Sequence, residues 1–312
     1  MGFIIKLIYD LVQNYGLAII LFTIVIKMIL MPLNVKSQKS LRKQQKIQPY
    51  IAQLQEKYKN DQQKLQQEMM KVYKDNNVSM MGGCLPMLLQ FPILISLYQV
   101  IQRPLQFMLG VIWEGDTWQG IVNLRDWIAS NASGLIGSYA GAEPLNIWNQ
   151  GQIFISKWAS VAPSSTLDGV QAAQNSWVIN FNFLGLDLST APGDAFNQAI
   201  SSGAWIGLVI FIIPVLAIVS SMVSMKISQM QSGQNANAQA NQMGKTMNLI
   251  MPLMTGFFTI ILPAGLGLYW IISSVVQIAQ QLAVNFYLDK KGEDIVVTIP
   301  EKKQLHGKKR KK

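Results

Sequence analysis

The chain has 312 residues, of which 50% are apolar and 13% are charged, whereas about 25% are charged in an average soluble domain. This composition excludes a disordered chain and argues against an ordinary soluble enzyme. The single Cys84 and the single His306 exclude a disulfide framework and a Cys/His metal cluster, so we expect no metal and no cofactor. The net charge of +10 alone is typical of nucleic-acid binding, but its distribution along the chain favours a membrane protein.

Residues 1–14 begin with a short apolar stretch that carries Lys6 and Asp10, so we expect an amphipathic extracytoplasmic helix on the membrane surface. Five apolar stretches follow, and a membrane span requires about 20 such residues. Pro263-Ala264-Gly265 divides the longest stretch in two, because proline removes a backbone donor and glycine frees the chain. The five predicted spans are 15–33, 84–112, 203–223, 247–262 and 263–287, the last including the turn.

Lysine and arginine mark the polar segments that we expect in the cytoplasm. Segment 34–83 holds ten Lys/Arg and four Asp/Glu, and the tail 288–312 holds nine and four. Segment 113–202 holds two Lys/Arg and seven Asp/Glu, and 224–246, predicted to be a cytoplasmic loop, holds two lysines and no acid. The sequence therefore predicts an all-α polytopic membrane protein with five transmembrane helices. We expect the N-terminus outside, the C-terminus inside, and an enlarged extracytoplasmic segment over 113–202.

Segment 34–83 has apolar residues at helical spacing on both sides of Lys59-Asn60-Asp61, which predicts a cytoplasmic basic helical hairpin with a kink or interruption at Pro49. The apolar stripe fits a hairpin that closes on itself. The basic remainder fits a paddle that contacts lipid headgroups or a client chain, since each lysine near anionic lipid contributes about 1 kcal/mol. The basic tail 288–312 fits a solvated charge run, a site for anionic lipid, or a site for RNA of a ribosome near the membrane.

Two short motifs resemble catalytic signatures without their context. Gly244-Lys245-Thr246 matches the end of a phosphate-binding loop, yet Gln239 stands where the first glycine is required. Ser40 and Lys43 have the spacing of a nucleophile motif, but they lie on a predicted basic helix and no partner motif accompanies them. We therefore expect no catalytic residue and no enzyme activity.

Lys27 is the most informative residue, because it lies inside the first span with apolar neighbours on both sides. A charge at mid-helix costs about 2.5–3.5 kcal/mol on insertion scales, and such residues usually face a bundle interior or a wet cavity. Alternatively, its stem could snorkel to the cytoplasmic headgroups. No predicted span contains Asp or Glu, which favours a hydrated cavity that receives an anion from another molecule. The polar residues that could line such a cavity, or simply bond one helix to another, are Thr23, Gln90, Gln99, Thr255, Ser273, Ser274 and Gln277.

Several linked segments together resemble the YidC-type insertases of the Oxa superfamily. They match, in the family's order, the first core span, a Gln-Pro pair in the hairpin, the entry of the second span, the segment before the third span and the turn between the fourth and fifth spans. The resemblance covers roughly residues 14–110 and 181–288, and 113–180 is longer than the family's typical connection. The matching segments are Asn14–Leu33, Gln48-Pro49, Met81–Tyr98, Phe183–Leu188 and Leu262–Trp270.

The resemblance implies an insertase and chaperone of the bacterial plasma membrane that moves nascent membrane proteins from the cytoplasm into the bilayer. It implies that Lys27 projects into a hydrophilic groove open to the cytoplasm and the lipid. The family commonly has Arg at this position, and a lysine holds its charge there only if the groove is wet. We expect a client-binding groove formed by Lys27, Gln90, Trp270, Thr23 and Gln277.

The expected partners are nascent membrane proteins and anionic lipids, with a ribosome at the basic tail and the general secretion channel as further candidates. The main alternative is a transporter or channel subunit, for which inverted repeats would be an indication. The sequence shows no internal repeat and no carboxylate for ion coupling in the predicted spans. A membrane-embedded enzyme is a second alternative, but the spans lack a credible nucleophile–base set.

Overall fold

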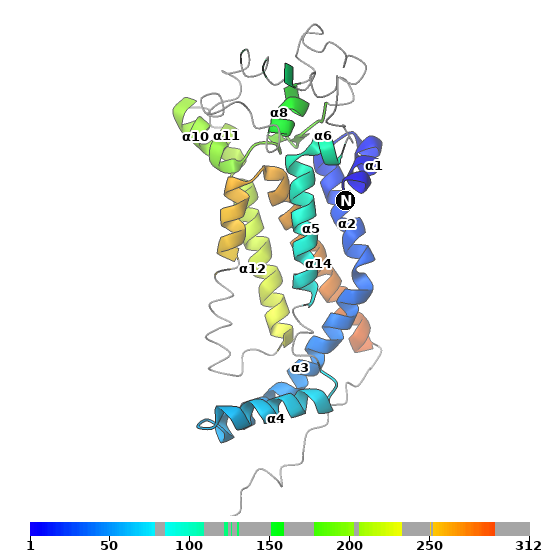
Figure 1. The fold of residues 1–312 in the computed structure, drawn as a ribbon, viewed down its shortest axis with the longest axis vertical. Helices are drawn as coiled ribbons and strands as arrows, with labels where there is room; N and C mark the ends of the chain where they lie inside the picture. The colour runs from blue at the N-terminus through cyan, green and yellow to red at the C-terminus, as the bar shows by residue number, and fades with distance from the viewer. Residues whose placement is uncertain are drawn as a thin grey trace, which may run out of the picture. The chain divides into compact units, whose positions relative to one another are not determined.

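The computed structural model of the chain describes residues 1–78, 85–108, 151–158, 178–202, 206–232 and 252–290, and the single residues 122, 123, 126, 130 and 250. The described residues are almost entirely helical, as predicted (Figure 1). Two short strands, β1 (Asn182–Phe183) and β2 (Leu186–Asp187), pair antiparallel as one hairpin. The chain divides into two compact units. The first unit contains Met1–Ile29, Gln90–Met222 and Ile250–Gln277, and the second contains Leu30–Leu89, Val223–Leu249 and Ile278–Lys312.

Prolines lie close to several of the breaks in the predicted spans. Helix α2 (Tyr15–Ile29) ends before the predicted limit of the first span, and α3 (Met31–Lys57) begins after Leu30. Pro32 has no amide hydrogen to donate to the carbonyl of Met28, so a continuous helix would lose a bond there. Proline also opens α6 (Pro104–Phe107), directly after α5 (Leu85–Gln102), and lies in the first turn of α12 (Ile212–Ser232), just after α11 (Ile206–Val209).

Helix α12 continues past the predicted end of the third span. Residues 224–232 are therefore helical, although the sequence predicts a loop over 224–246. This stretch contains neither proline nor glycine, so nothing in it ends a helix that has already formed. The rest of that predicted loop lies outside the described residues. So do Cys84, His306, most of the segment 113–202 and the tail beyond Lys290.

By length and composition, one described helix is apolar and long enough to cross a membrane, namely α14 (Ala264–Lys290). Helices α2 and α3 count as a second candidate when they are taken as one bent pair. Two shorter apolar helices are Ile212–Ser228, which begins in the third predicted span and extends beyond it, and Pro252–Ile261, which lies within the fourth. A helical membrane protein fits these findings, whereas the number of five spans and their orientation stay predictions.

The residues around the β hairpin bind to the start of α2 and to α1 (Gly2–Val12), which contact each other. The amide of Tyr15 donates to the carbonyl of Asn180 at 3.1 Å, and the amide of Asn180 donates to the hydroxyl of Tyr9 at 2.8 Å. A Cβ atom on Gly16 would lie 2.4 Å from Cγ of Phe183, so only glycine allows this close approach. The hairpin is thus fixed against the first two helices.

The same hairpin segment caps the beginning of α14. The amide of Ala264 donates to the carbonyl of Thr190, and the amide of Gly265 donates to the carbonyl of Leu188, both at 3.0 Å. The first amides of a helix have no acceptor within the helix itself, so an outside carbonyl must supply one. The segment therefore joins the starts of α2 and α14, two of the three helices that carry the polar residues described below.

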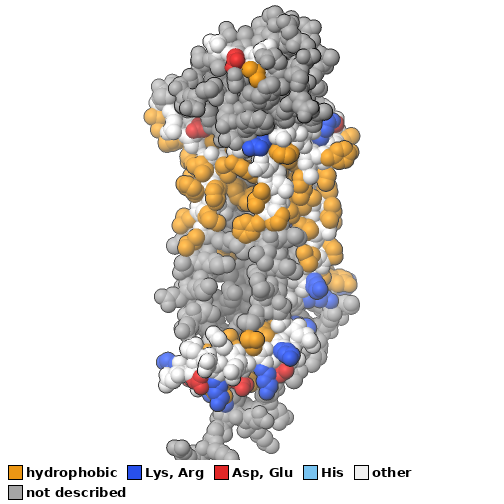
Figure 2. Space-filling view, viewed as in Figure 1, with side chains coloured by type: hydrophobic (Ala, Val, Ile, Leu, Met, Phe, Trp, Pro, Cys, Tyr) orange, Lys and Arg blue, Asp and Glu red, His pale blue; other side chains and the backbone are white. Residues whose placement is uncertain are grey.

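The second unit contains the helical hairpin formed by α3 and α4 (Gln62–Asp75), which lie side by side in Figure 1. The side chain of Asp61 accepts from the amide of Lys64 at 3.0 Å and caps α4. Helix α3 runs on through Pro49, where the sequence predicts a kink or an interruption. The apolar stripe packs between the helices, and Lys and Arg side chains gather on the hairpin surface (Figure 2). The buried core comprises Ile47, Tyr50, Ile51, Leu54, Leu65, Val72 and Val78.

We expect Leu54→Ala to destabilise this hairpin by about 2–5 kcal/mol, because it opens a cavity in a core where Leu54 is 2% exposed. Hydrogen–deuterium exchange of peptides from α3 and α4 would measure the loss of protection. Met70→Ala is the control, since Met70 is 62% exposed and surface substitutions usually change stability by less than about 0.5 kcal/mol. Equal protection in both variants would contradict the packed core.

Candidate functional site

Helix α2 carries Lys27 on its buried face. Tyr15, Ile19 and Thr23 precede Lys27 at intervals of four residues, and residues at this spacing share one side of a helix. All three are buried. Lys27 therefore extends from the side of α2 that packs against other parts of the first unit. Another part of the α2 surface is apolar and exposed, through Leu17, Leu21, Ile24, Val25, Met28 and Ile29.

The ammonium group of Lys27 lies among glutamines from two other helices. Its Nζ is 3.5 Å from Oε1 of Gln90 on α5 and 3.5 Å from Oε1 of Gln277 on α14. Both distances exceed the usual 2.7–3.2 Å of an N–H···O bond, so these contacts are loose. Amide oxygens are neutral acceptors, and they solvate the ammonium without neutralising its charge.

A tyrosine holds Gln90 in this orientation. Nε2 of Gln90 donates to the hydroxyl of Tyr269, which is buried on α14. This bond uses the amide NH₂ group and leaves Oε1 facing Lys27. Tyr269, Ser273 and Gln277 follow one another at intervals of four and form one polar stripe along α14. We refer to Lys27, Gln90, Tyr269 and Gln277 as the polar cluster.

The structure brings together three of the five predicted groove residues. Thr23 is buried, but its hydroxyl donates to the carbonyl of Ile19 at 2.7 Å, inside its own helix. Trp270 directly follows Tyr269 and is half-buried. Consecutive helical residues point about 100° apart, so Trp270 faces a different side of α14. A role for either residue stays a prediction.

Sequence reasoning missed Tyr269. The residue is visible in the segment that ends at Trp270, but a tyrosine in an apolar run looks like a packing or interfacial residue. The available signal was its four-residue spacing to Ser273 and Gln277, both of which were candidates for lining a cavity.

These observations define a helical membrane protein with a lysine-centred polar cluster among apolar helices. The sequence pattern of the family described as "60Kd inner membrane protein" matches residues 7–291, and the chain therefore belongs to this family. The resemblance to the YidC-type insertases is thereby confirmed.

Relatives that carry the name "Membrane protein insertase YidC" match this chain, two of them over most of its length. The protein of Clostridium perfringens is 29% identical over 98% of this chain and 89% of its own length. The protein of Syntrophobacter fumaroxidans is 30% identical over 91% of this chain, which spans 36% of that longer relative. The protein of Clostridium tetani is 50% identical over 36% of this chain and 52% of its own length.

We expect Gln90 and Tyr269 to be energetically coupled. A double-mutant cycle of Gln90→Ala and Tyr269→Phe should give about 0.6 kcal/mol of coupling, the average for polar pairs between membrane helices. Unfolding of the protein in detergent would measure it. Gln90→Ala combined with Thr23→Val is the control, and these two effects should add within about 0.5 kcal/mol. Additive effects in the first pair as well would contradict the bond.

Proposed function

We propose that this chain inserts nascent membrane proteins into the bacterial plasma membrane, and that the polar cluster receives the polar end of each client. Family membership and the shared name of the relatives support membrane protein insertion. The position of Lys27 Nζ, between amide oxygens of α5 and α14, is the observation that supports its role. A lysine that snorkelled to the headgroups would turn its amine away from such neighbours.

The chemistry of the cluster favours a client with a short acidic tail before an apolar segment. Two unit charges 4 Å apart attract by about 4 kcal/mol at an effective dielectric of 20. This attraction is comparable with the cost of about 2.5–3.5 kcal/mol for placing a charged residue at the centre of a span. The cationic lysine therefore offsets the cost of bringing the client's carboxylate into the span region.

The apolar segment of the client then moves into lipid along the exposed apolar faces of the first and fifth predicted spans. Val25 and Met28 contribute to this face on α2, and Val275 contributes to it on α14. The sequence contains no complete nucleotide motif, so we assign the driving force to client hydrophobicity and to the membrane potential. The potential contributes about 2.3 kcal/mol per charge and 100 mV.

The other predicted parts have supporting roles in this proposal. In this proposal, the hairpin over 34–83 and the tail over 288–312 lie in the cytoplasm, as the predicted arrangement of five spans implies. Because the apolar stripe of the hairpin is used in its own core, its basic surface is the part that meets lipid headgroups or the client. The basic tail docks anionic lipid or a ribosome, and the general secretion channel is a further partner. We propose no catalytic step.

A transporter or channel subunit remains the alternative from another functional class. Purified protein in liposomes distinguishes the two, because a transporter moves small solutes in the absence of any client chain. Solute flux without insertion would favour the alternative.

We expect the charge at position 27 to control insertion of a single-span client with an acidic tail. Lys27→Arg should insert nearly normally, Lys27→Gln about tenfold less, equivalent to about 1.4 kcal/mol, and Lys27→Glu least because like charges repel. Insertion into liposomes of defined composition is the measurement. A client with an uncharged tail is the control and should respond less. Normal insertion by Lys27→Glu would remove Lys27 from the mechanism and leave the insertase assignment open.

We also expect water to reach the polar cluster from the cytoplasm. In a Cys84→Ser background, Gln277→Cys should react with a membrane-impermeant maleimide about tenfold faster than Val275→Cys, because the thiolate is the reactive species and forms only in a polar site. Val275 is the matched control, since it lies on the same helix and is exposed on its apolar side. If both cysteines react equally slowly from the cytoplasmic side, the cluster is not hydrated.

A further inference from the structure

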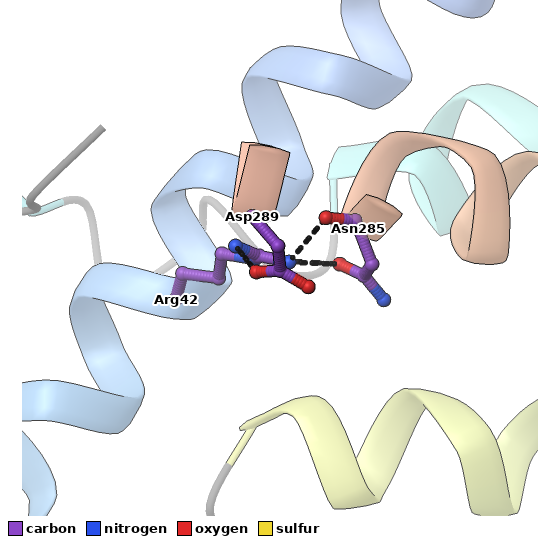
Figure 3. A network of polar contacts seen from close by, with 3 residues as sticks. All are labelled: Arg42, Asn285 and Asp289. Carbon is purple, nitrogen blue, oxygen red and sulfur yellow. Dashed lines mark hydrogen bonds and ion pairs between the residues drawn. The ribbon is translucent and has the colours of Figure 1, made fainter. Parts of the chain in front are cut away.

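Arg42 on α3 makes a dense set of contacts with the last turns of α14, all within the second unit (Figure 3). Its Nη1 lies 2.7 Å from Oδ1 of Asp289. Its Nη2 donates to Oδ1 of Asn285 at 2.9 Å and to the carbonyl of Asn285 at 3.1 Å. Its Nε adds a contact of 3.3 Å to the same Oδ1. Three nitrogens of one planar guanidinium group are thus engaged by two residues.

The place of these contacts on α14 makes them favourable. The last four carbonyls of a helix receive no hydrogen bond from within the helix, and its C-terminal end carries partial negative charge. Arg42 brings a positive charge to this end, and the carbonyl of Asn285, five residues before the helix ends at Lys290, accepts an additional bond from it. An exposed ion pair alone contributes little to stability, and Asp289 is 69% exposed. The bonds to Asn285, made by an arginine that is 21% exposed, distinguish this cluster from an ordinary surface pair.

A second contact fastens α3 further along α14. Nδ2 of Asn34 donates to Oε1 of Gln280 at 3.1 Å. Asn34 and Arg42 are eight residues apart on α3, so they lie on one side of that helix. The first part of α3 is therefore attached to α14, whereas the part after Ile47 packs against α4 in the hairpin core. Helix α3 thus contacts α14 with its first part and α4 with its second part.

We propose that Arg42, Asn285 and Asp289 form a latch that fixes the base of the basic hairpin on α14, and that Arg42 is a positioning residue for client delivery. This inference rests on the proposed function, in which the hairpin meets the client. Arg42 lies twelve residues after the break at Leu30, in the part of α3 that precedes the hairpin core. A fixed base limits the positions that the hairpin can adopt, so the client meets one arrangement of basic side chains.

The latch itself is tested by hydrogen–deuterium exchange of the full chain in lipid nanodiscs. We expect Arg42→Gln to raise exchange in peptides covering 31–46 by about tenfold, equivalent to about 1.4 kcal/mol. Arg42→Lys should lie in between, because an ammonium keeps the charge but loses the planar fork. Lys43→Gln is the matched control, since it removes the same charge from the next residue and should leave exchange unchanged. Unchanged exchange in Arg42→Gln would overturn the latch.

The positioning role is tested by insertion of a client into liposomes. We expect Arg42→Gln to lower insertion about threefold or more, a change that about 0.7 kcal/mol would produce, and Lys43→Gln to lower it less. The exchanged pair Arg42→Glu with Asp289→Arg should recover part of the loss. Normal insertion by Arg42→Gln, despite raised exchange, would overturn the positioning role.

Failure of the proposed function and failure of the latch give different results. If the unmodified chain inserts no client, the proposed function fails, whereas the exchange experiment still decides whether the latch exists. If Arg42→Gln does not fold, Asn285→Ala and Asp289→Asn take its place, with the same expected increase in exchange over 31–46 and the same expected loss of insertion.

Discussion

A positive charge inside an apolar helix is the constraint on which the rest of this structure depends. Moving an ammonium out of water is costly, and the cost falls only when polar atoms surround the charge. Lys27 meets this requirement through α5 and α14, whose glutamine oxygens face its Nζ. Helices α2, α5 and α14 must therefore be held in register, and the β hairpin segment, which bonds to the starts of α2 and α14, helps to do so.

Sequence reasoning identified Lys27, Gln90 and Gln277 because a polar residue in an apolar run needs a partner. It could not decide which polar residues would meet. The hydroxyl of a threonine can bond to the carbonyl four residues earlier in its own helix, and Thr23 does so. The amides of Gln90 and Gln277 instead meet groups on other helices. The sequence does not distinguish these two outcomes, and Tyr269 was missed because its ring resembles an apolar residue.

The class of fold followed from hydropathy, whereas the ends of helices did not. A hydropathy window averages many residues, so a single proline hardly changes its value. The predicted span therefore continues across Pro32 and joins α2 to the start of α3. It also ends a predicted span where apolar residues stop, at 223, although α12 continues to Ser232. Hydropathy indicates whether a segment lies in lipid or in water, whereas backbone hydrogen bonding determines where the helix ends. The two limits coincide only where a helix-breaking residue lies at the membrane boundary.

Lys27 and Arg42 show two ways in which this chain accommodates a cation. The guanidinium of Arg42 lies against the carboxylate of Asp289 and the C-terminal end of α14, so its charge is used in holding two elements together. The two glutamine oxygens near Lys27 solvate its ammonium but carry no net charge. Arg42 therefore holds two elements together, whereas the client-binding role of Lys27 stays a proposal.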